Sequence, residues 1–459
     1  MQTYNYIIRF LRLAIANTLS NIMIPLAGLI SLTFVGHLSN ASYLSGIIMG
    51  AILFDFIYQS LIFVRMATTG LTAQAVGSNN QEEVLLIGFR NSIVALGLGI
   101  IILVLQHPLQ QLGFAILSGT PEVELAGIDY FNARIWGAPA VLLNFAILGW
   151  LLGREEGGKV LLLSLVGNSA NIALSYLFVV QWNWASMGAG FSETLSQYLM
   201  LLLGLILIAV QISRTDIQTD IRSILEQSFR LSNYKSILAL NTNILVKTLT
   251  IILAFLLFNY LSSEMGTIPF TQNGLMLNIA ILTFFLLEGV EMATESLTGN
   301  AQGKGEQKTF VFLLGMSGGT NLVIGLTFAL ACVVFPQRIF GLLTNHGEFI
   351  EGIYIYTRWL ILVLGFASLS FTLEGFFLGL AEGRILRNAS LACFGLGFTP
   401  VAFAAWYFHS NHLLWLSLSM FMLVRMLSLG TQLLFRYIEV DLQDWVWKKF
   451  ITQLENKEE

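Results

Sequence analysis

One segment, Arg65-Met-Ala-Thr-Thr-Gly-Leu-Thr-Ala-Gln-Ala-Val-Gly77, returns 226 residues later as Glu291-Met-Ala-Thr-Glu-Ser-Leu-Thr-Gly-Asn-Ala-Gln-Gly303. A second pair, Phe145–Gly153 and Phe371–Gly379, has the same offset. Two matches at a single offset indicate that the chain consists of two related halves. Whether such halves are parallel or inverted depends on how many times each one crosses the membrane.

Composition places both halves in a membrane. Of the 459 residues, 56% are hydrophobic and only 11% are charged, too few charges for the surface of a water-soluble protein of this length. Apolar segments of about 20 residues or more, the length that crosses a bilayer as a helix, recur along the chain. We predict twelve spans, at residues 13–35, 44–76, 84–106, 124–152, 160–180, 186–210, 236–260, 267–298, 309–335, 350–380, 388–408 and 412–435. The predicted fold class is an all-α polytopic membrane protein with twelve transmembrane helices in two pseudo-symmetric six-helix bundles, which makes the halves parallel repeats.

The predicted organisation has four parts, with a side of the membrane assigned to each connection. The parts are an N-terminal six-helix bundle (1–212), a cytoplasmic linker (213–235), a C-terminal six-helix bundle (236–438) and a cytoplasmic tail (439–459). Lys and Arg collect in cytoplasmic connections. They occur in the even-numbered connections, for example Arg154 and Lys159, whereas the odd-numbered ones hold only Arg338. We therefore expect a multi-pass protein of the inner (plasma) membrane with both termini in the cytoplasm.

Several short motifs accompany the repeat. They are Pro25–His37, Leu148–Gly153, Asn168 with Asn171, and Glu288-Gly289 followed by Ala293–Leu297. Together with the repeated segment they resemble multidrug and toxic compound extrusion (MATE) transporters of the DinF type, over essentially the whole chain. The resemblance implies the MATE fold and an antiporter that exports organic cations or other amphipathic compounds, driven by proton or sodium entry, with no cofactor. Exporters of cyanobacterial toxins of the saxitoxin class belong to this family, so such a toxin is one expected cargo.

The chain departs from that family at two positions. The resemblance implies an aspartate at the positions of Ser31 and Ser175, whereas Asn171 fits the family pattern. A hydroxyl can coordinate sodium or form a hydrogen bond with a cargo, but it does not titrate near neutral pH. The family's usual coupling route through the N-terminal half therefore lacks its carboxylates here.

Acidic residues inside the apolar segments carry the predicted chemistry. Glu288, Glu291 and Glu295 are spaced i, i+3 and i+7, which places them within an arc of about 60° on a helix. Glu374 lies in the tenth span, and Glu193 lies near the start of the sixth. An ionised carboxylate at the bilayer centre costs about 2.5–3.5 kcal/mol on insertion scales, so we expect these acids to face the bundle interior or a wet cavity.

Two overlapping sets of candidate residues follow. The predicted cargo-binding set is Glu288, Glu291, Glu295, Glu374, Ser31, Tyr58 and Asn171. The predicted ion-coupling set is Glu288, Glu374, Glu193, Asn171 and Ser175. Tyr58 is included because an aromatic ring can stack on a cation, although anchoring at the membrane interface is the commoner role of such residues.

Basic residues in the spans offer a structural alternative. Arg65, Arg134 and Lys247 are predicted to form internal ion pairs that neutralise some of the glutamates, and Arg358 and Arg425 also lie in the spans. Arg65 occupies the repeat position of Glu291, so an exchange of partners across the pseudo-symmetric interface is geometrically feasible.

The predicted function is secondary active export by alternating access. The acids hold a cationic cargo when ionised, and proton entry from outside neutralises a carboxylate and releases the cargo. The surplus of acids favours a strongly cationic ligand such as a guanidinium-bearing natural product. A flippase for a lipid-linked intermediate is the alternative, but it would need a basic cavity for phosphate.

Other functional classes lack support in the sequence. No nucleophile with a base, no metal-ligand set and no phosphate-binding Gly-rich loop is recognisable, so neither an enzyme nor an ATP-driven pump is expected. No basic run indicates a nucleic acid partner. Cys332 and Cys393 lie far apart in apolar segments, which predicts neither a disulfide nor a metal site. The expected partners are a small cationic molecule and membrane lipid, and the chain is expected to act as a monomer.

Overall fold

The computed structural model describes residues 2–37, 41–117, 119–214, 227–228, 234–344 and 352–438, and within these ranges the regular structure is helical, without strands. Twelve helical segments among them are long and apolar enough to cross a membrane. They match the predicted spans in number and order, which confirms the predicted fold class. Most of the predicted linker 213–235 and all of the predicted tail 439–459 lie outside the described residues.

The first six spans form the N-terminal bundle. Its helices are α1 (Gln2–Gly36), α2 (Ala41–Leu61), α3 (Phe63–Gly77), α4 (Gln81–Val104), α5 (Gln106–Leu117), α6 (Pro121–Arg134), α7 (Ala138–Gly153), α8 (Gly157–Ser175) and α9 (Ala185–Arg214). Helices α2 and α3 belong to one span that breaks at Ile62. Helices α6 and α7 also form one span, and Pro139 lies in the first turn of α7, where its missing N–H breaks no helical hydrogen bond.

The last six spans form the C-terminal bundle. Its helices are α11 (Tyr234–Ser263), α12 (Thr267–Lys304), α13 (Phe310–Val334), α14 (Pro336–Phe340), α16 (Tyr354–Thr357), α17 (Trp359–Gly379), α18 (Gly383–Ala392), α19 (Thr399–Phe408) and α20 (Asn411–Leu433). A π-helical turn, Cys393–Phe398, joins α18 to α19 within one span. Helix α12 has 38 residues, about 57 Å at 1.5 Å per residue, so it projects well beyond a hydrocarbon layer of about 30 Å.

The sequence repeat recurs in the backbone of the turns. Three pairs of residues at the same offset of 226 each adopt a positive φ: Asn79 (57°) with Gly305 (73°), Glu155 (60°) with Ala381 (56°), and Asn183 (54°) with His409 (47°). A non-glycine residue with positive φ is uncommon, because its Cβ clashes with the backbone. Equivalent turns in the two halves therefore share an unusual conformation, as expected of two copies of one fold.

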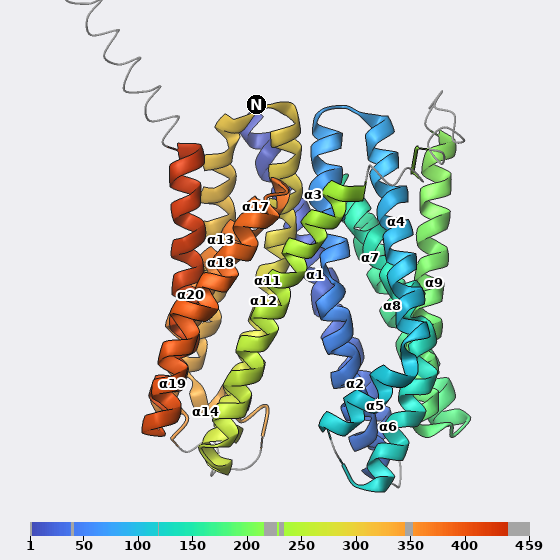
Figure 1. Ribbon diagram of the computed structural model, residues 1–459, viewed down its shortest axis with the longest axis vertical. Coiled ribbons are helices and arrows are strands. Elements are labelled where there is room, and N and C mark those ends of the chain that lie inside the picture. Colours follow the sequence, from blue (N-terminus) through green and yellow to red (C-terminus); the bar gives the residue numbers. More distant parts are fainter. Residues whose placement is uncertain are drawn as a thin grey trace, which may run out of the picture.

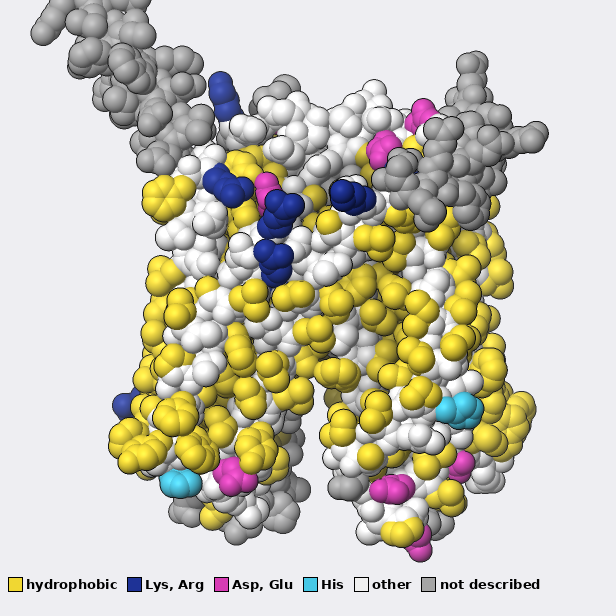
Figure 2. Space-filling view, viewed as in Figure 1, with side chains coloured by type: hydrophobic (Ala, Val, Ile, Leu, Met, Phe, Trp, Pro, Cys, Tyr) yellow, Lys and Arg dark blue, Asp and Glu magenta, His cyan; other side chains and the backbone are white. Residues whose placement is uncertain are grey.

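Figure 1 shows the two bundles meeting at the end that carries the N-terminus and diverging toward the opposite end. Figure 2 shows that this divergence leaves a cleft between the bundles, which opens at the end far from the N-terminus and closes inside the molecule. Where the bundles meet, α1 and α3 of the first half contact α12, and α3 also contacts α17. We call this contact surface the inter-bundle seam.

Two glycines at equivalent repeat positions hold the seam closed near its end. A Cβ on Gly77 would lie 2.1 Å from the backbone oxygen of Asn300, and a Cβ on Gly303 would lie 2.1 Å from the backbone oxygen of Gln74. Gln74 and Asn300 are themselves repeat equivalents, so the two contacts are related by the pseudo-two-fold axis. Only a residue without a side chain permits backbones to approach this closely.

The burial pattern locates the other limit of the seam. Every residue from Phe63 to Gly70 in α3 and from Gly289 to Ala301 in α12 is buried, whereas exposed and buried residues alternate in α12 before Gly289. The seam therefore begins at Phe63 and Gly289. The cleft lies on the side of α2 and of the first part of α12.

Candidate cargo and coupling site

A buried ionic cluster occupies the C-terminal bundle. Glu374 on α17 forms ion pairs with Lys247 on α11 and with Arg425 on α20, and all three side chains are buried. The Arg425 guanidinium also lies over the ring of Phe371, 5.5 Å from its centroid. Because both oxygens of Glu374 face cations of the protein itself, cargo has no access to this carboxylate in this conformation. Its predicted roles in cargo binding and coupling remain predictions.

Two further glutamates lie on α12 beside this cluster. Glu291 and Glu295 are buried, and neither forms an ion pair within 4 Å among the described residues. One oxygen of Glu295, Oε1, has no hydrogen-bond partner. The four predicted glutamates of α12 and α17 are thus opposed by three cations, Arg65, Lys247 and Arg425, so the group has one carboxylate in excess.

An ion pair joins the two bundles where the cleft ends. Arg65 Nη2 on α3 lies 2.8 Å from Glu288 Oε1 on α12. The Arg65 side chain is 5% exposed and the Glu288 side chain is 25% exposed. Since the seam is buried from Gly289 onward, the exposed part of Glu288 faces the cleft. Among the predicted acids of α12 and α17, Glu288 is therefore the one that a molecule in the cleft can reach.

A network of neutral groups occupies the N-terminal bundle where the resemblance implied aspartates. Ser31 on α1 donates to Asn171 Oδ1 on α8 at 2.8 Å, and Ser175 contacts Ser31 at 3.2 Å and Asn171 at 3.3 Å. The hydroxyl of Ser192 on α9 lies 2.7 Å from that of Ser175. The structure thus brings three of the predicted residues of this half, Ser31, Asn171 and Ser175, together and adds Ser192. Four oxygen-bearing side chains converge without a titratable group among them.

Arg134 lies in an aromatic cage beside this network. Its guanidinium donates to the Tyr130 hydroxyl at 2.6 Å and lies 3.8 Å from Glu193. The guanidinium carbon is 4.8 Å from the centroid of Phe54 and 5.8 Å from that of Tyr58. Such positions above ring faces are favourable for a cation. Tyr58, predicted to stack on a cationic cargo, thus stacks on the protein's own arginine, and its hydroxyl is buried without a hydrogen-bond partner.

Asp55 belongs to the same group and was missed by the sequence analysis. It is exposed, lies next to Phe54 in α2, and interacts electrostatically with Arg134 and Glu193. A signal was present, since Asp55 is a lone acid in the apolar run Ile52–Ile57, and an ionisable residue inside a span is a functional candidate by default. In this group of the N-terminal bundle, two acids, Asp55 and Glu193, surround one cation, Arg134, so one acid is again in excess.

The three basic residues predicted to form internal pairs each have an acidic neighbour in the structure. Arg65 pairs with Glu288, Arg134 with Glu193 and Lys247 with Glu374. Arg65 does not pair with Glu291, its repeat equivalent. The predicted cargo-binding residues are divided between the two bundles, with Ser31, Tyr58 and Asn171 in the first and the glutamates in the second.

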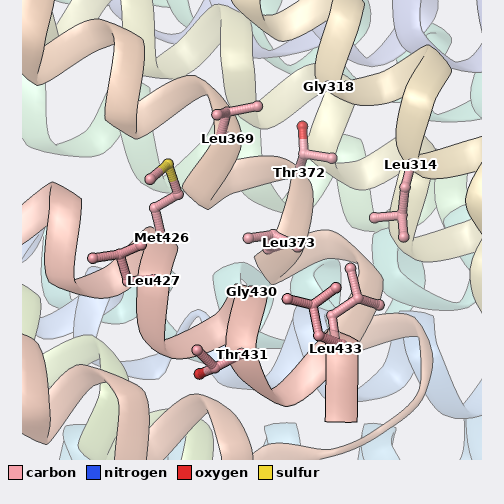
Figure 3. Close-up of a pocket in the computed structure, with 11 residues that line it drawn as sticks. Leu314, Gly318, Leu369, Thr372, Leu373, Met426, Leu427, Gly430, Thr431 and Leu433 are labelled. Atoms are coloured by element: carbon pink, nitrogen blue, oxygen red, sulfur yellow. The ribbon is translucent and has the colours of Figure 1, made fainter. Parts of the chain in front are cut away.

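An apolar cavity of about 310 Å³ lies between α13, α17 and α20 of the C-terminal bundle (Figure 3). It is lined by Leu314, Gly318, Leu369, Thr372, Leu373, Met426, Leu427, Gly430, Thr431, Leu433 and Leu434. Its lining contains no charged side chain, and the Thr372 hydroxyl already receives hydrogen bonds from Ser317 and Asn321. This cavity offers nothing to neutralise a cation, so it does not contribute to the candidate site.

A comparison with known proteins assigns the family. A sequence profile of the MatE family matches residues 17–177 and 244–403, one block in each half. The chain belongs to the MatE family. It is similar to DNA damage-inducible protein F of Escherichia coli (strain K12), 29% identical over 418 residues, which cover 91% of this chain and 90% of the relative. It is also 21% identical over 346 residues to a probable multidrug resistance protein NorM of Thermotoga maritima, covering 74% of this chain and 73% of the relative.

Solved structures share the fold. The outward-facing conformation of a multidrug resistance MATE family transporter superposes with a TM-score of 0.84 at 18% identity, covering 95% of this chain and 96% of that one. A transporter from Pyrococcus furiosus, described as having a binding pocket of reverse polarity, gives a TM-score of 0.80 at 17% identity, covering 94% and 95%. The protein is therefore a multi-pass membrane transporter of the MATE multidrug efflux family and not an enzyme, as predicted.

Proposed function

We propose that this MatE protein exports small organic cations in exchange for protons or sodium, as a transporter of the DinF type. The observation that carries the proposal is the surplus of acid beside the cleft. Four glutamates of the C-terminal bundle are opposed by three cations, of which Lys247 and Arg425 belong to the same bundle and Arg65 to the other, and the Glu288 side chain is 25% exposed. In the N-terminal bundle Asp55 and Glu193 oppose Arg134 alone. A cation between the bundles is attracted from both sides, whereas an anion is repelled.

The working mechanism is competition for these carboxylates. A cargo cation binds at the end of the cleft beside Glu288, and an entering proton or sodium ion neutralises a carboxylate and lowers the affinity for the cargo. Exchange follows because the cargo and the ion cannot both bind the same carboxylate at the same time. Ser31, Asn171, Ser175 and Ser192 offer oxygen atoms that suit sodium, but none of these four side chains exchanges a proton near neutral pH, so proton coupling has to use a carboxylate.

The proposed orientation has both termini in the cytoplasm of a cell bounded by the inner membrane. Dark blue Lys and Arg side chains gather at the end of the molecule that carries the N-terminus (Figure 2). The positive-inside rule assigns that end to the cytoplasm. The cleft then opens to the outside, and this conformation is the one that releases cargo. We expect the transporter to work as a monomer surrounded by lipid, because each chain has its own cleft.

The proposed cargo carries a guanidinium or an amine, and a saxitoxin-class toxin remains one candidate. A guanidinium matches a carboxylate with two parallel hydrogen bonds, and Arg134 already shows how this chain receives one, over aromatic rings and beside Glu193. A lipid-linked phosphate is disfavoured as cargo by the acids at the cleft, and family membership does not favour a flippase either.

Ligand-induced stabilisation in detergent tests the proposed cargo class. We expect methylguanidinium and tetraethylammonium to raise the melting temperature of the chain, with no rise for glycerol phosphate. The same titration on Glu288→Gln should show a weaker response, whereas Glu382→Gln should respond as wild type. Stabilisation by the phosphate alone would refute the proposal. Cargo-dependent proton and sodium fluxes in reconstituted vesicles then identify the coupling ion.

A further inference from the structure

The ion pair between Arg65 and Glu288 lies where the buried runs of α3 and α12 begin, at the inner end of the cleft. Arg65 follows Phe63, the first residue of the buried run in α3, and Glu288 precedes Gly289, the first residue of the buried run in α12. The pair therefore joins the two bundles at the inner end of the cleft. A ligand that replaced either partner would act directly on the contact between the bundles.

We propose that Glu288 is a cation-binding carboxylate that Arg65 occupies when the cleft is empty, and that a guanidinium or amine cargo displaces Arg65 toward Glu295 and so loosens the seam. The inference rests on the proposed function, because it takes the cargo to be a cation. It adds the site where cargo binding is converted into a change of conformation.

The geometry of the pair suits displacement. Arg65 contacts Glu288 through Nη2 alone, and its Nη1 is buried without a hydrogen-bond partner. A two-fold contact between a guanidinium and a carboxylate is stronger and better oriented than this single one. The exposed part of the Glu288 side chain can be reached by a second cation, whereas the Arg65 side chain is almost fully buried. A cargo guanidinium that makes both hydrogen bonds can therefore compete with the resident one.

Glu295 is the natural second position for Arg65. Its Oε1 is buried without a hydrogen-bond partner, and Arg65 already acts on this carboxylate electrostatically. Glu295 follows Glu288 by seven residues, about 10 Å along α12 on the same face. One unpaired donor of Arg65 and one unpaired acceptor of Glu295 thus lie in the same buried region. A displaced arginine has a partner there, so it does not remain as a buried unpaired charge, which would cost several kcal/mol.

The surrounding contacts would transmit such a movement to the seam. A Cβ on Gly289, next to Glu288, would lie 2.5 Å from the Cα of Thr18 on α1, and the backbone oxygen of Arg65 lies 2.5 Å from the Cβ position of Gly149. These backbones have no room to slide independently. A shift of Arg65 along α12 therefore disturbs the packing of α3 against α12, whose closed end is the contact of Gly77 with Asn300 and of Gly303 with Gln74.

The experiment measures cation binding and seam opening on the same protein. The full chain is purified in detergent with Cys332→Ala and Cys393→Ala, and spin labels are placed at Gln81→Cys and Lys308→Cys, which are exposed on opposite bundles at the closed end. Methylguanidinium is the probe, and N-methylurea, of the same shape but uncharged, is the control. We expect methylguanidinium to add a longer distance between the labels and N-methylurea to add none.

Four variants and one control variant assign the effect to named residues. Removing the resident competitor by Arg65→Gln, or weakening it by Arg65→Lys, should raise the affinity for methylguanidinium, by roughly ten-fold for Arg65→Gln. Glu288→Gln should abolish the distance change. Glu295→Gln should lower the affinity, because Arg65 then has no second partner. Arg436→Gln, which breaks an exposed pair with Glu382 at 3.8 Å within one bundle, should behave as wild type.

Two results would overturn the inference. One is methylguanidinium binding to wild type with no change in the distance between labels. The other is a wild-type affinity in both Arg65→Lys and Glu295→Gln, and these two variants keep the test valid if Arg65→Gln does not fold. A wild-type chain that binds neither methylguanidinium nor tetraethylammonium would instead refute the proposed function. If the chain transports cations and the Arg65 and Glu295 variants bind methylguanidinium with wild-type affinity, this inference is refuted and the proposed function is not.

Discussion

The two halves of the molecule agree in backbone and disagree in charge. The Cβ position of Gly149 lies 2.5 Å from the oxygen of Arg65, and that of Gly375 lies 2.6 Å from the oxygen of Glu291, the repeat equivalents. The side chains of these two residues, Arg65 and Glu291, nevertheless carry opposite charges. Close backbone packing between equivalent helices gives both halves the same fold. The side chains that face the interior are not constrained by this packing, so they can differ in charge and in function between the halves.

The charge difference is largest deep in the bundles. Glu295, Glu374 and Lys247 in the second half correspond to Thr69, Leu148 and Asn21 in the first. The second half therefore has a buried ionic cluster where the first has neutral side chains. The first half instead holds its charges nearer the cleft, around Arg134. This difference predicts that equivalent substitutions will have unequal effects at charged positions and equal effects at packing glycines.

The largest effect is expected from breaking the buried cluster. Glu374→Gln removes the direct ion-pair partner of both Lys247 and Arg425, and breaking a buried pair in this way costs about 3–5 kcal/mol of unfolding free energy. Denaturant unfolding in detergent measures it. Leu148→Met, a volume-conserving substitution at the equivalent position of the first half, should lower the unfolding free energy by less than about 1.5 kcal/mol. Equal losses at the two positions would contradict the asymmetry.

The seam glycines should respond alike in the two halves. Gly77→Ala and Gly303→Ala each place a Cβ 2.1 Å from a backbone oxygen, so each should destabilise the closed seam by about 1–3 kcal/mol. The distance between labels at positions 81 and 308 reports the opening. Gly315→Ala on α13, where nothing lies within 4 Å of the Cβ position, is the matched control and should leave the distance unchanged. A response in only one of the two seam variants would argue against the pseudo-two-fold relation.

A smaller effect is expected in the hydroxyl network of the first half. Ser175→Ala removes the donor that reaches Ser31 and Asn171, and the loss of such a buried hydrogen bond costs about 1 kcal/mol. The exposed Ser213, which bonds only to its own helix, supplies the control Ser213→Ala with no measurable loss. Thermal unfolding measures both. A cost for Ser175→Ala as large as that for Glu374→Gln would contradict the account of a neutral, weakly held network.

The smallest effect concerns the connection between α7 and α8. Burial opposes ionisation of Glu156, but hydrogen bonds from Lys159 and Gln211 and the charge of Arg154 outweigh it and lower the pKa of this carboxyl. A lowered folded-state pKa stabilises the fold above the unfolded pKa, about 4.3, and this stability is lost as pH falls through the folded pKa.

Glu156→Gln should therefore reduce stability at neutral pH and by less at acid pH, when unfolding is measured between pH 3 and pH 7. Among the residues that the structure describes, the repeat equivalent, Glu382, forms an ion pair with the exposed Arg436 alone, 3.8 Å away. Glu382→Gln should change stability less at every pH. A pH-independent loss in Glu156→Gln would show that the carboxylate charge does not matter there.

The spans and the repeat could be predicted from sequence because both depend on local patterns. A run of about twenty apolar residues is sufficient to identify a span, and the offset of 226 identified equivalent helices before any contact was known. The i, i+3, i+7 spacing also identified three acids on one face of α12. Each of these signals lies within a single segment.

The pairing of charges could not be predicted in the same way. Whether Arg65 contacts Glu288 or Glu291 depends on the axial offset of α3 against α12, and only three residues, about 4.5 Å along the helix axis, separate the two choices. The enclosure of Glu374 depends on Lys247 and Arg425, which come from two other helices. Asp55 differs from these two cases, because the sequence shows its position inside an apolar run and leaves only its spatial neighbours, Arg134 and Glu193, unknown.

Methylguanidinium-driven proton or sodium flux in proteoliposomes tests most directly whether the cleft carboxylate holds the cargo. Wild type, Glu288→Gln and the control Glu382→Gln are reconstituted at equal density, and ion flux is recorded on addition of methylguanidinium. We predict coupled flux in wild type and in Glu382→Gln and a loss of at least ten-fold, or roughly 1.4 kcal/mol, in Glu288→Gln. Full coupled flux in Glu288→Gln would contradict the account.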